Sequence, residues 1–391
     1  MILRGARIFD GTRLVDGMAV HVEGDRVALR PDDGTGQDLG GGILAPGFVD
    51  LQVNGGGGLM LDGRSGPAEI ATICAAHARL GATGILPTLI TDRPEATAAV
   101  LSAGIAAAEA GVPGFLGLHL EGPHLDPRRK GAHDPALIRP MNDADLARLL
   151  DAAARLPALI VTLSPTAASP AQIAALAGAG VIVSLGHSDC TAPEAEAALA
   201  AGASMVTHLF NAMSQLGHRS PGLVGAALGG AADCGLIADG HHVDPIALRV
   251  ALAAKRQGRL FLVSDAMAVA GTQAREFTLG GRRILREGGR LTLQDGTLAG
   301  ADLSLPQAVA RLVELTGTPL EEALAMASRV PADILRRPDL GRLNAGARAH
   351  LVHLGDDLAL RAVWQDGNLL APLPGPEMAA STGLENRHRD G

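Results

Sequence analysis

The chain has 391 residues, of which 47% are hydrophobic, and its formal net charge is −8. This length allows one large domain with a smaller companion and is ample for a buried core. The negative charge and the absence of a basic stripe exclude a general nucleic-acid or anionic-membrane binder, because such binding requires phosphate neutralisation by Lys and Arg. An anionic ligand would need its own local positive site.

The three cysteines, Cys74, Cys190 and Cys234, are widely spaced and form no C-x-x-C pair. This pattern predicts reduced thiols in a cytoplasmic protein, and neither a disulfide framework nor a zinc knuckle. The first residues, MILRGARIFDG, lack the apolar core of a signal peptide and indicate a strand closed by a turn. We therefore expect a cytoplasmic protein that does not interact with membranes.

Short β-like runs and Gly/Asp turns occur at both ends of the chain, over residues 1–45 and 336–374. They predict one small β domain that is built from both termini. Residues 375–391 are polar without periodicity, and we expect a disordered tail there.

Residues 46–335 alternate apolar strands with helical patterns, which predicts a parallel sheet covered by helices. Eight strands are the number that closes a (β/α)8 TIM barrel, although an open doubly wound sheet would share most of this pattern. After the eighth strand, the segment EFTLGGRRILREGGRLTLQDG predicts a hairpin insertion. The eight candidate strands are FVDLQVNG, TGILPTL, FLGLHLEG, ALIVTLSP, VIVSLGH, SMVTHLFN, CGLIADG and FLVSDA.

Four of these strands end at residues capable of metal binding or proton transfer, namely Glu121, His187, His208 and Asp265. In a parallel barrel such strand ends face one rim, so the four side chains can converge. A catalytic zinc site needs three protein ligands and an open position, and Glu121, His187 and His208 supply that set. Each histidine taken alone could equally be a hydrogen-bonded core residue.

Other candidate residues could have either a functional or a purely structural role. Asp265 could accept a proton from water and pass it on, or it could simply cap the turn that follows it. Arg219 could bind an anion such as phosphate, or it could be a solvated surface residue. His133, Asn211 and His242 lie in or near the loops that accompany these strand ends.

Eight segments in shared order resemble the N-acetylglucosamine-6-phosphate deacetylases of the amidohydrolase superfamily, over nearly the whole chain. The resemblance implies a metal-bearing (β/α)8 barrel with a small β-sandwich domain formed from both chain termini. The segments are PGFVDLQVNGGGG, LHLEGPHLDPRRKGAHDP, LGHSDCT, VTHLFNAM, HRSPGLVGAAL, GLIADGHHVD, LVSDAMAVAG and GTLAGADLSL.

The resemblance also assigns roles to individual positions. Glu121, His187 and His208 match the metal ligands, Asp265 matches the general acid/base, and His133 matches the histidine that contacts the scissile amide. The family is typically homodimeric, and its phosphate site can take an arginine and a histidine from the neighbouring subunit. The positions similar to substrate-binding residues are Ala132, Asn211, Ala212, Arg219, His242, Leu298, Ala299 and Gly300.

The chain departs from many amidohydrolases at the end of the first strand, where Gln52 and Asn54 replace the usual His-x-His pair. Neutral amide oxygens bind zinc weakly compared with imidazole or carboxylate. We therefore expect one divalent metal ion per subunit, with Zn2+ as the expected ion and Fe2+ or another divalent ion as the alternative.

The activity that the resemblance implies is hydrolysis of N-acetyl-D-glucosamine 6-phosphate to D-glucosamine 6-phosphate and acetate. Three alternatives stay open. The chain could be a cyclic-amide hydrolase or deaminase of the same superfamily, although the segments KGAHDP and HLFNAM resemble the deacetylases more closely. The substrate could be the N-acetylgalactosamine isomer, because the sequence does not show which orientation of one sugar hydroxyl group the site accepts. The chain could also be a catalytically silent, amidohydrolase-like scaffold, although the joint presence of Glu121, His187, His208 and Asp265 weighs against this.

Overall fold

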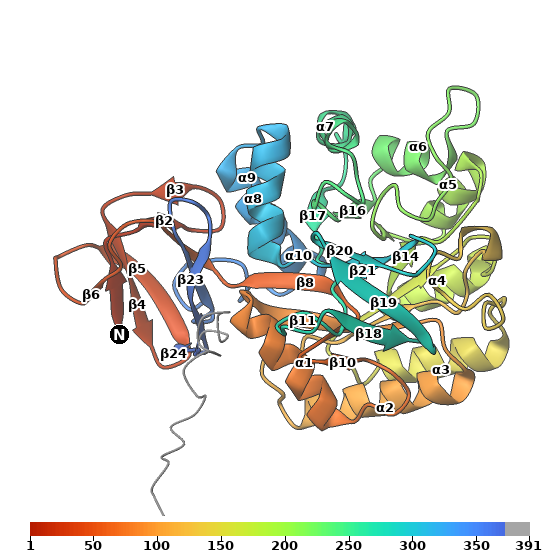
Figure 1. Cartoon of the computed structure of the whole chain (residues 1–391), viewed down its shortest axis with the longest axis horizontal. Coiled ribbons are helices and arrows are strands. Elements are labelled where there is room, and N and C mark those ends of the chain that lie inside the picture. Colours follow the sequence, from red (N-terminus) through yellow and green to blue (C-terminus); the bar gives the residue numbers. More distant parts are fainter. Residues whose placement is uncertain (372–391) are drawn as a thin grey trace, which may run out of the picture.

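The computed structural model describes residues 1–371, and its centre is an eight-stranded parallel sheet whose strand order follows the chain order. All eight predicted strands are present, which confirms the predicted fold class (Figure 1). Their apolar runs are buried on both faces, as expected for a sheet enclosed by helices. The strands are β8 (Phe48–Val53), β11 (Ala82–Ile90), β12 (Leu118–Glu121), β13 (Leu159–Leu163), β14 (Ile182–Leu185), β15 (Met205–Val206), β16 (Asp233–Leu236) and β17 (Leu260–Leu262).

Seven helices alternate with these strands, and most of them start at a proline. Proline suits the first turn because its missing N–H would have no partner there. Asn142, Ser169 and Thr191 accept a hydrogen bond from the third residue of their helices and so fix three of the starts. The helices are α1 (Pro67–Arg79), α2 (Pro94–Glu109), α3 (Asp143–Ala153), α4 (Pro170–Gly178), α5 (Ala192–Ala200), α6 (Gly222–Gly229) and α7 (Pro245–Ala254).

The sheet closes into a barrel between its end strands, β8 and β17. Asp265 N–H donates to the Gln52 carbonyl at 3.0 Å, and Asn54 N–H donates to the Ala266 carbonyl at 2.8 Å. The buried Asp50 carboxylate accepts from Ser264 N–H at 3.2 Å. Three further helices contact this seam from outside, α8 (Leu305–Thr316), α9 (Leu320–Ala327) and α10 (Arg329–Ile334).

Strands from both chain ends form a separate unit beside the barrel, at the left of Figure 1. In its six-stranded sheet β7 pairs antiparallel with β22, so Leu44 lies opposite His353. The order of that sheet is β24 (Asn368–Leu369), β23 (Leu360–Gln365), β22 (Leu351–Leu354), β7 (Ile43–Pro46), β2 (Arg7–Phe9) and β3 (Leu14–Val15).

A four-stranded sheet packs on it through a core that includes Leu3, Val20, Leu351 and Trp364. This second sheet consists of β5 (Arg26–Pro31), β4 (Met18–Glu23), β1 (Ile2–Arg4) and β6 (Gln37–Asp38). The boundaries at residues 45 and 335 stay predictions. The boundary at residue 374 and the tail expected over residues 375–391 lie outside the described residues.

The insertion after β17 is larger than the single expected hairpin. It forms a four-stranded antiparallel sheet with its own small core, which includes Met267, Ile284 and Leu291, and it lies across the barrel in Figure 1. Its strands are β18 (Glu276–Leu279), β19 (Arg282–Glu287), β20 (Arg290–Thr292) and β21 (Leu298–Ala301). A short hairpin, β9 (Gly55–Gly56) with β10 (Leu59–Met60), follows β8.

Gly117, the residue just before β12, allows this strand to pack in the barrel. Its φ is +139°, and a Cβ at this position would lie 2.1 Å from the Ala158 carbonyl oxygen. We expect Gly117→Ala to lower the free energy of unfolding by about 3 kcal/mol or more, because backbone strain adds to a clash with backbone. Chemical denaturation followed by circular dichroism measures this.

Gly178→Ala is the matched control, because this exposed residue ends α4 and a Cβ there would meet nothing within 4 Å. Alanine should stabilise that helix by about 0.5 to 1 kcal/mol. Equal stability changes in the two variants would contradict the role given to Gly117.

Candidate metal centre and active site

Glu121, His187, His208 and Asp265 meet at the rim formed by the carboxyl ends of the barrel strands. Glu121 is the last residue of β12, and the other three follow the ends of β14, β15 and β17. All four line one cavity of about 420 Å³. The barrel thus brings together residues that are separated by up to 144 positions in the sequence (265 − 121).

Three ligand atoms form a nearly equilateral triangle. His208 Nε2 lies 3.0 Å from Glu121 Oε1 and 3.1 Å from His187 Nε2, and His187 Nε2 lies 3.3 Å from Glu121 Oε1. Tetrahedral zinc has ligands about 2.1 Å away, which places neighbouring ligand atoms roughly 3.3 to 3.4 Å apart. The triangle therefore fits one face of such a coordination shell.

The orientation of His187 is set by a loop that leaves β12. Its Nδ1–H donates to the Arg129 carbonyl at 2.8 Å, which leaves Nε2 to face the triangle. Arg129 ends the short 3-10 helix η1 (Pro127–Arg129) and donates to Asp189. The backbone of the same loop donates from Asp126 N–H to the His187 carbonyl.

The electrostatics of the triangle favour positive charge. Burial would raise the pKa of Glu121, but hydrogen bonds from His187 and His208 outweigh it and hold that pKa well below its ordinary value. Burial would lower the pKa of His208, but the Glu121 carboxylate raises it instead. An ionised carboxylate therefore lies buried here, where a bound cation would neutralise it.

His133 is a fourth candidate ligand. Glu121, His133 and His187 offer ligand atoms within 4.8 Å of one another, and His133 Nε2 lies 3.8 Å from Glu121 Oε2. Its Nδ1 accepts a hydrogen bond from Thr91 N–H at 3.2 Å, so the ring proton of the neutral form is on Nε2. Burial, followed by the charge of His187, lowers the pKa of His133 to about 3.

This tautomer makes His133 Nε2–H a hydrogen-bond donor toward the cavity and not a metal ligand, which needs a free lone pair. His208 completes the triangle more closely, since its Nε2 lies within 3.1 Å of both other ligand atoms. The geometry thus favours the ligand set expected from the sequence.

Asp265 is held by the two amides at the end of β8. Gln52 Nε2 donates to Asp265 Oδ1 at 3.1 Å, and Asn54 Nδ2 donates to the same oxygen at 2.7 Å. Burial and then the charge of Glu121 raise the pKa of Asp265 to about 6. Among the described residues both hydrogen bonds fall on Oδ1, so Oδ2 is available to exchange a proton.

Backbone strain concentrates at this rim. His187, His208 and Asp265 have φ values of +44°, +29° and +50°, although none of them is glycine. Such conformations cost about 1 to 3 kcal/mol each and persist where the surroundings impose them. The strain is a further mark of a functional site.

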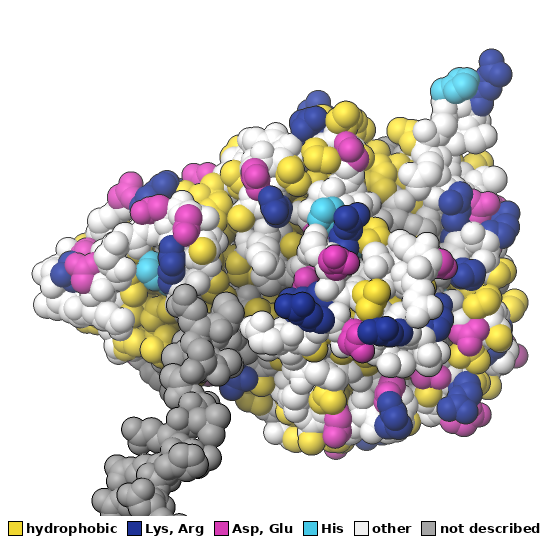
Figure 2. Space-filling view, viewed as in Figure 1, with side chains coloured by type: hydrophobic (Ala, Val, Ile, Leu, Met, Phe, Trp, Pro, Cys, Tyr) yellow, Lys and Arg dark blue, Asp and Glu magenta, His cyan; other side chains and the backbone are white. Residues whose placement is uncertain are grey.

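The expected substrate-binding residues are only partly brought together. Arg219 is exposed in the segment 214–221, which projects away from the barrel before α6 (Figure 1), and basic and histidine side chains mark the projecting tip in Figure 2. Ala299 is buried in the core of the antiparallel sheet. The six that line the cavity are Ala132, Asn211, Ala212, His242, Leu298 and Gly300.

His242 is oriented by Asp239, whose carboxylate lies 2.6 Å from its Nδ1. Several other residues that line the cavity are not predicted as site residues from the sequence. Ile90 could have been found, because it directly follows the predicted strand TGILPTL, and in the structure it ends β11 just as Glu121 ends β12. Asn54 and Ile237 also lie in predicted strands. The others depend on the fold of the insertion and of nearby loops, and they are Gly131, Met267, Leu279, Gly296 and Thr297.

Known proteins resemble this chain over most of its length. An N-acetylgalactosamine-6-phosphate deacetylase of Shewanella sp. is 41% identical over 85% of this chain and 84% of its own length. The human N-acetylglucosamine-6-phosphate deacetylase is 38% identical over 94% and 93%. The crystal structure of N-acetylglucosamine-6-phosphate deacetylase from Pasteurella multocida superposes with a TM-score of 0.90 at 31% identity, covering 95% of this chain and 99% of that one.

Residues 43–371 also match the amidohydrolase family. Among residues 1–371, no helix is long and apolar enough to cross a membrane. The chain therefore belongs to the amidohydrolase family, in the branch that holds the N-acetylglucosamine- and N-acetylgalactosamine-6-phosphate deacetylases.

Proposed function

We propose that this protein hydrolyses the acetamide of N-acetyl-D-glucosamine 6-phosphate to D-glucosamine 6-phosphate and acetate. The observation that carries the proposal is the placement of Asp265 beside the Glu121, His187 and His208 triangle, in one cavity with the His133 donor. This arrangement provides a proton carrier, a cation site and a carbonyl-oxygen donor, which are the groups that amide hydrolysis requires.

One divalent ion would be held by Glu121 Oε1, His187 Nε2 and His208 Nε2, with zinc favoured by the spacing of these atoms. When bound, such an ion polarises an amide carbonyl and acidifies water. Iron is the alternative, because imidazole and carboxylate ligands also accept Fe2+.

Asp265 carries the proton in this reaction. Its carboxylate takes a proton from the water that attacks the carbonyl carbon and then gives it to the amine nitrogen as the carbon–nitrogen bond breaks. A pKa near 6 suits both steps at neutral pH, because the group is ionised before attack and is still a usable acid afterwards. Gln52 and Asn54 keep the carboxylate in place throughout.

His133 stabilises the carbonyl oxygen as negative charge develops on it. Its low pKa keeps the ring neutral, and the Thr91 N–H fixes the tautomer with its proton on Nε2. A preorganised donor of this kind typically contributes about 2.7 to 4 kcal/mol to lowering a barrier. His133 is therefore a catalytic residue that needs no change of protonation state.

The sugar and its phosphate would be bound by Asn211, His242 and the backbone around Ala212 and Gly300. Arg219 is exposed and does not line the cavity of its own chain, so we infer a homodimer in which each Arg219 serves the partner's phosphate site. The three cysteines are buried and unpaired, which suits a reducing compartment such as the cytoplasm.

N-acetyl-D-galactosamine 6-phosphate is the second candidate substrate, because the Shewanella relative at 41% identity is named for that sugar. Acetate release from both isomers, and from unphosphorylated N-acetylglucosamine, tests the assignment. Faster turnover of the glucosamine isomer supports the main proposal, and faster turnover of the galactosamine isomer favours the second candidate. No release from any of them would favour a silent scaffold.

Replacing Asp265 by Asn should reduce kcat by about 10² to 10⁴-fold or more, because the amide cannot carry the proton. Substrate binding and metal content should be nearly unchanged, as measured by calorimetry and elemental analysis. Asp244→Asn is the control, since this residue caps α7 and Asn caps equally well. A variant that keeps most of its rate would remove Asp265 from this role.

Elemental analysis of the active protein should find one divalent ion per chain. Removing it with a chelator should abolish acetate release, and adding back zinc or iron should restore it. The physical reason is that Gln52 and Asn54 present amide donors where a second ion would need ligands. Two tightly held ions per chain would refute the single-metal proposal.

Changing Arg219 to Ala should raise KM for the phosphorylated substrate roughly 10- to 100-fold, because a hydrogen bond to a charged group contributes about 1.5 to 3 kcal/mol. The unphosphorylated sugar should be little affected. Arg256→Ala, another exposed arginine, is the control and should change neither value. An equal effect on both substrates would make Arg219 structural.

A further inference from the structure

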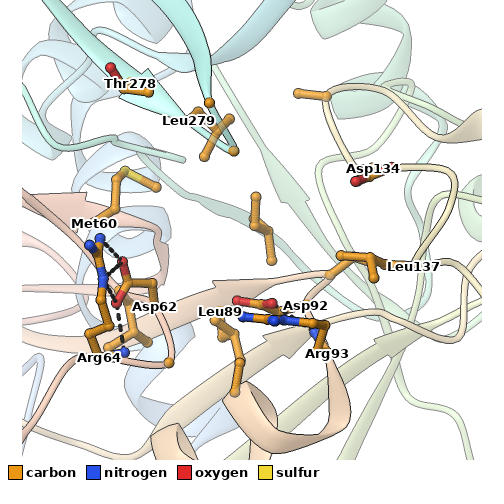
Figure 3. A pocket seen from close by; sticks show the side chains of 18 of the residues that line it. Met60, Asp62, Arg64, Leu89, Asp92, Arg93, Asp134, Leu137, Thr278 and Leu279 are labelled. Carbon is orange, nitrogen blue, oxygen red and sulfur yellow. Dashed lines mark hydrogen bonds and ion pairs between the residues drawn. The ribbon is translucent and has the colours of Figure 1, made fainter.

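A second cavity of about 850 Å³ lies next to the active site. It is bounded by the loop after β10, the end of β11 and the turn between β18 and β19. Figure 3 shows Leu279 on one side of it, with Asp92 and Arg93 on the other, and Arg64 paired with Asp62 at its margin. This cavity is not used by the mechanism described above.

The two cavities share three lining residues, Ile90, Ala132 and Leu279, which we call the acyl wall. All three belong to or pack on one apolar cluster with Met267. The acyl wall lies directly beside the residues proposed to act in catalysis. Ile90 pairs with Glu121 in the β11–β12 register, the Thr91 N–H holds His133, and Ala132 precedes His133 in the chain.

The rest of the active-site lining is mixed: it contains the apolar side chains of Ile237, Met267 and Leu298, and it also contains the polar side chains of Asn211, His242 and Thr297. A hexosamine phosphate has hydroxyl and phosphate groups that need such partners, and its only apolar substituent at the reacting amide is the acyl chain. Complementarity therefore directs the sugar toward the polar lining and the acyl chain toward the acyl wall.

We propose that the acyl wall determines the length of the acyl group that this enzyme removes, and that the second cavity would receive longer chains if the wall were trimmed. The inference rests on the proposed deacetylase function and extends it to acyl specificity. An acetyl methyl fits in front of the wall, whereas a longer chain would have to displace Ile90 or Leu279 to reach the space behind.

Within the wall, Leu279 is supported from the insertion and not from the metal centre. Leu279 ends β18 and pairs with Arg282 of β19, and the Arg282 guanidinium donates to the Ala132 carbonyl. Trimming Leu279 thus leaves the bonds of Glu121, His187 and Asp265 untouched. This separation makes acyl specificity testable without loss of the catalytic groups.

The test compares kcat/KM for N-acetyl, N-propionyl and N-butyryl glucosamine 6-phosphate in the wild type and in Leu279→Ala. The wild type should lose about 10- to 200-fold for each added methylene that its pocket cannot accommodate. In Leu279→Ala the ratio of butyryl to acetyl turnover should rise at least tenfold, while metal content stays at the wild-type value. Ile90→Ala provides a second variant if Leu279→Ala folds poorly.

Leu137→Ala is the matched control, because Leu137 lines the second cavity but not the active-site cavity. It removes the same number of atoms and should leave the butyryl-to-acetyl ratio unchanged. An unchanged ratio in both wall variants, or an equal rise in Leu137→Ala, would overturn the inference. Failure of the wild type to release acetate would instead refute the proposed function on which it rests.

Discussion

The seam between β8 and β17 is the constraint on which both the barrel and its chemistry depend. The two strands are joined by a few bonds near the rim, in which Asp50 accepts from Ser264 N–H and Gln52 accepts from Asp265 N–H. The side chains of Gln52 and Asn54 then hold the Asp265 carboxylate. The residues that close the barrel are thus also the ones that position Asp265, the proposed proton carrier.

This coupling has a cost in stability that the packing around the seam offsets. Burial raises the pKa of Asp50 to about 7, so an ionised carboxylate there is unfavourable despite its hydrogen bonds. The positive φ of Asp265 adds strain at the same place. Helices α8, α9 and α10 cover the seam from outside. Their apolar contacts stabilise the seam, where only a few hydrogen bonds join the two strands.

The strands and the four reactive rim residues could be predicted because each follows from local pattern, namely a short apolar run that ends at a polar residue. The orientation of His187 could not, since it depends on the carbonyl of Arg129, 58 residues away. Nor could the exposed position of Arg219 or the meeting of Leu279 with Ile90 and Ala132 in the acyl wall, because both depend on how loops and the insertion pack on the finished barrel.

The amides at the end of β8 also support the proposed role of Asp265 as a base. Gln52 directs its N–H groups at Glu121 and at Asp265, and Asn54 directs its own at Asp265. Donor groups so placed repel a cation from the space between the two carboxylates, where imidazoles would attract one. A cation bound there would lower the pKa of Asp265 and prevent it from taking a proton. Amides in place of imidazoles therefore leave Asp265 free for its proposed role as the carrier of a proton.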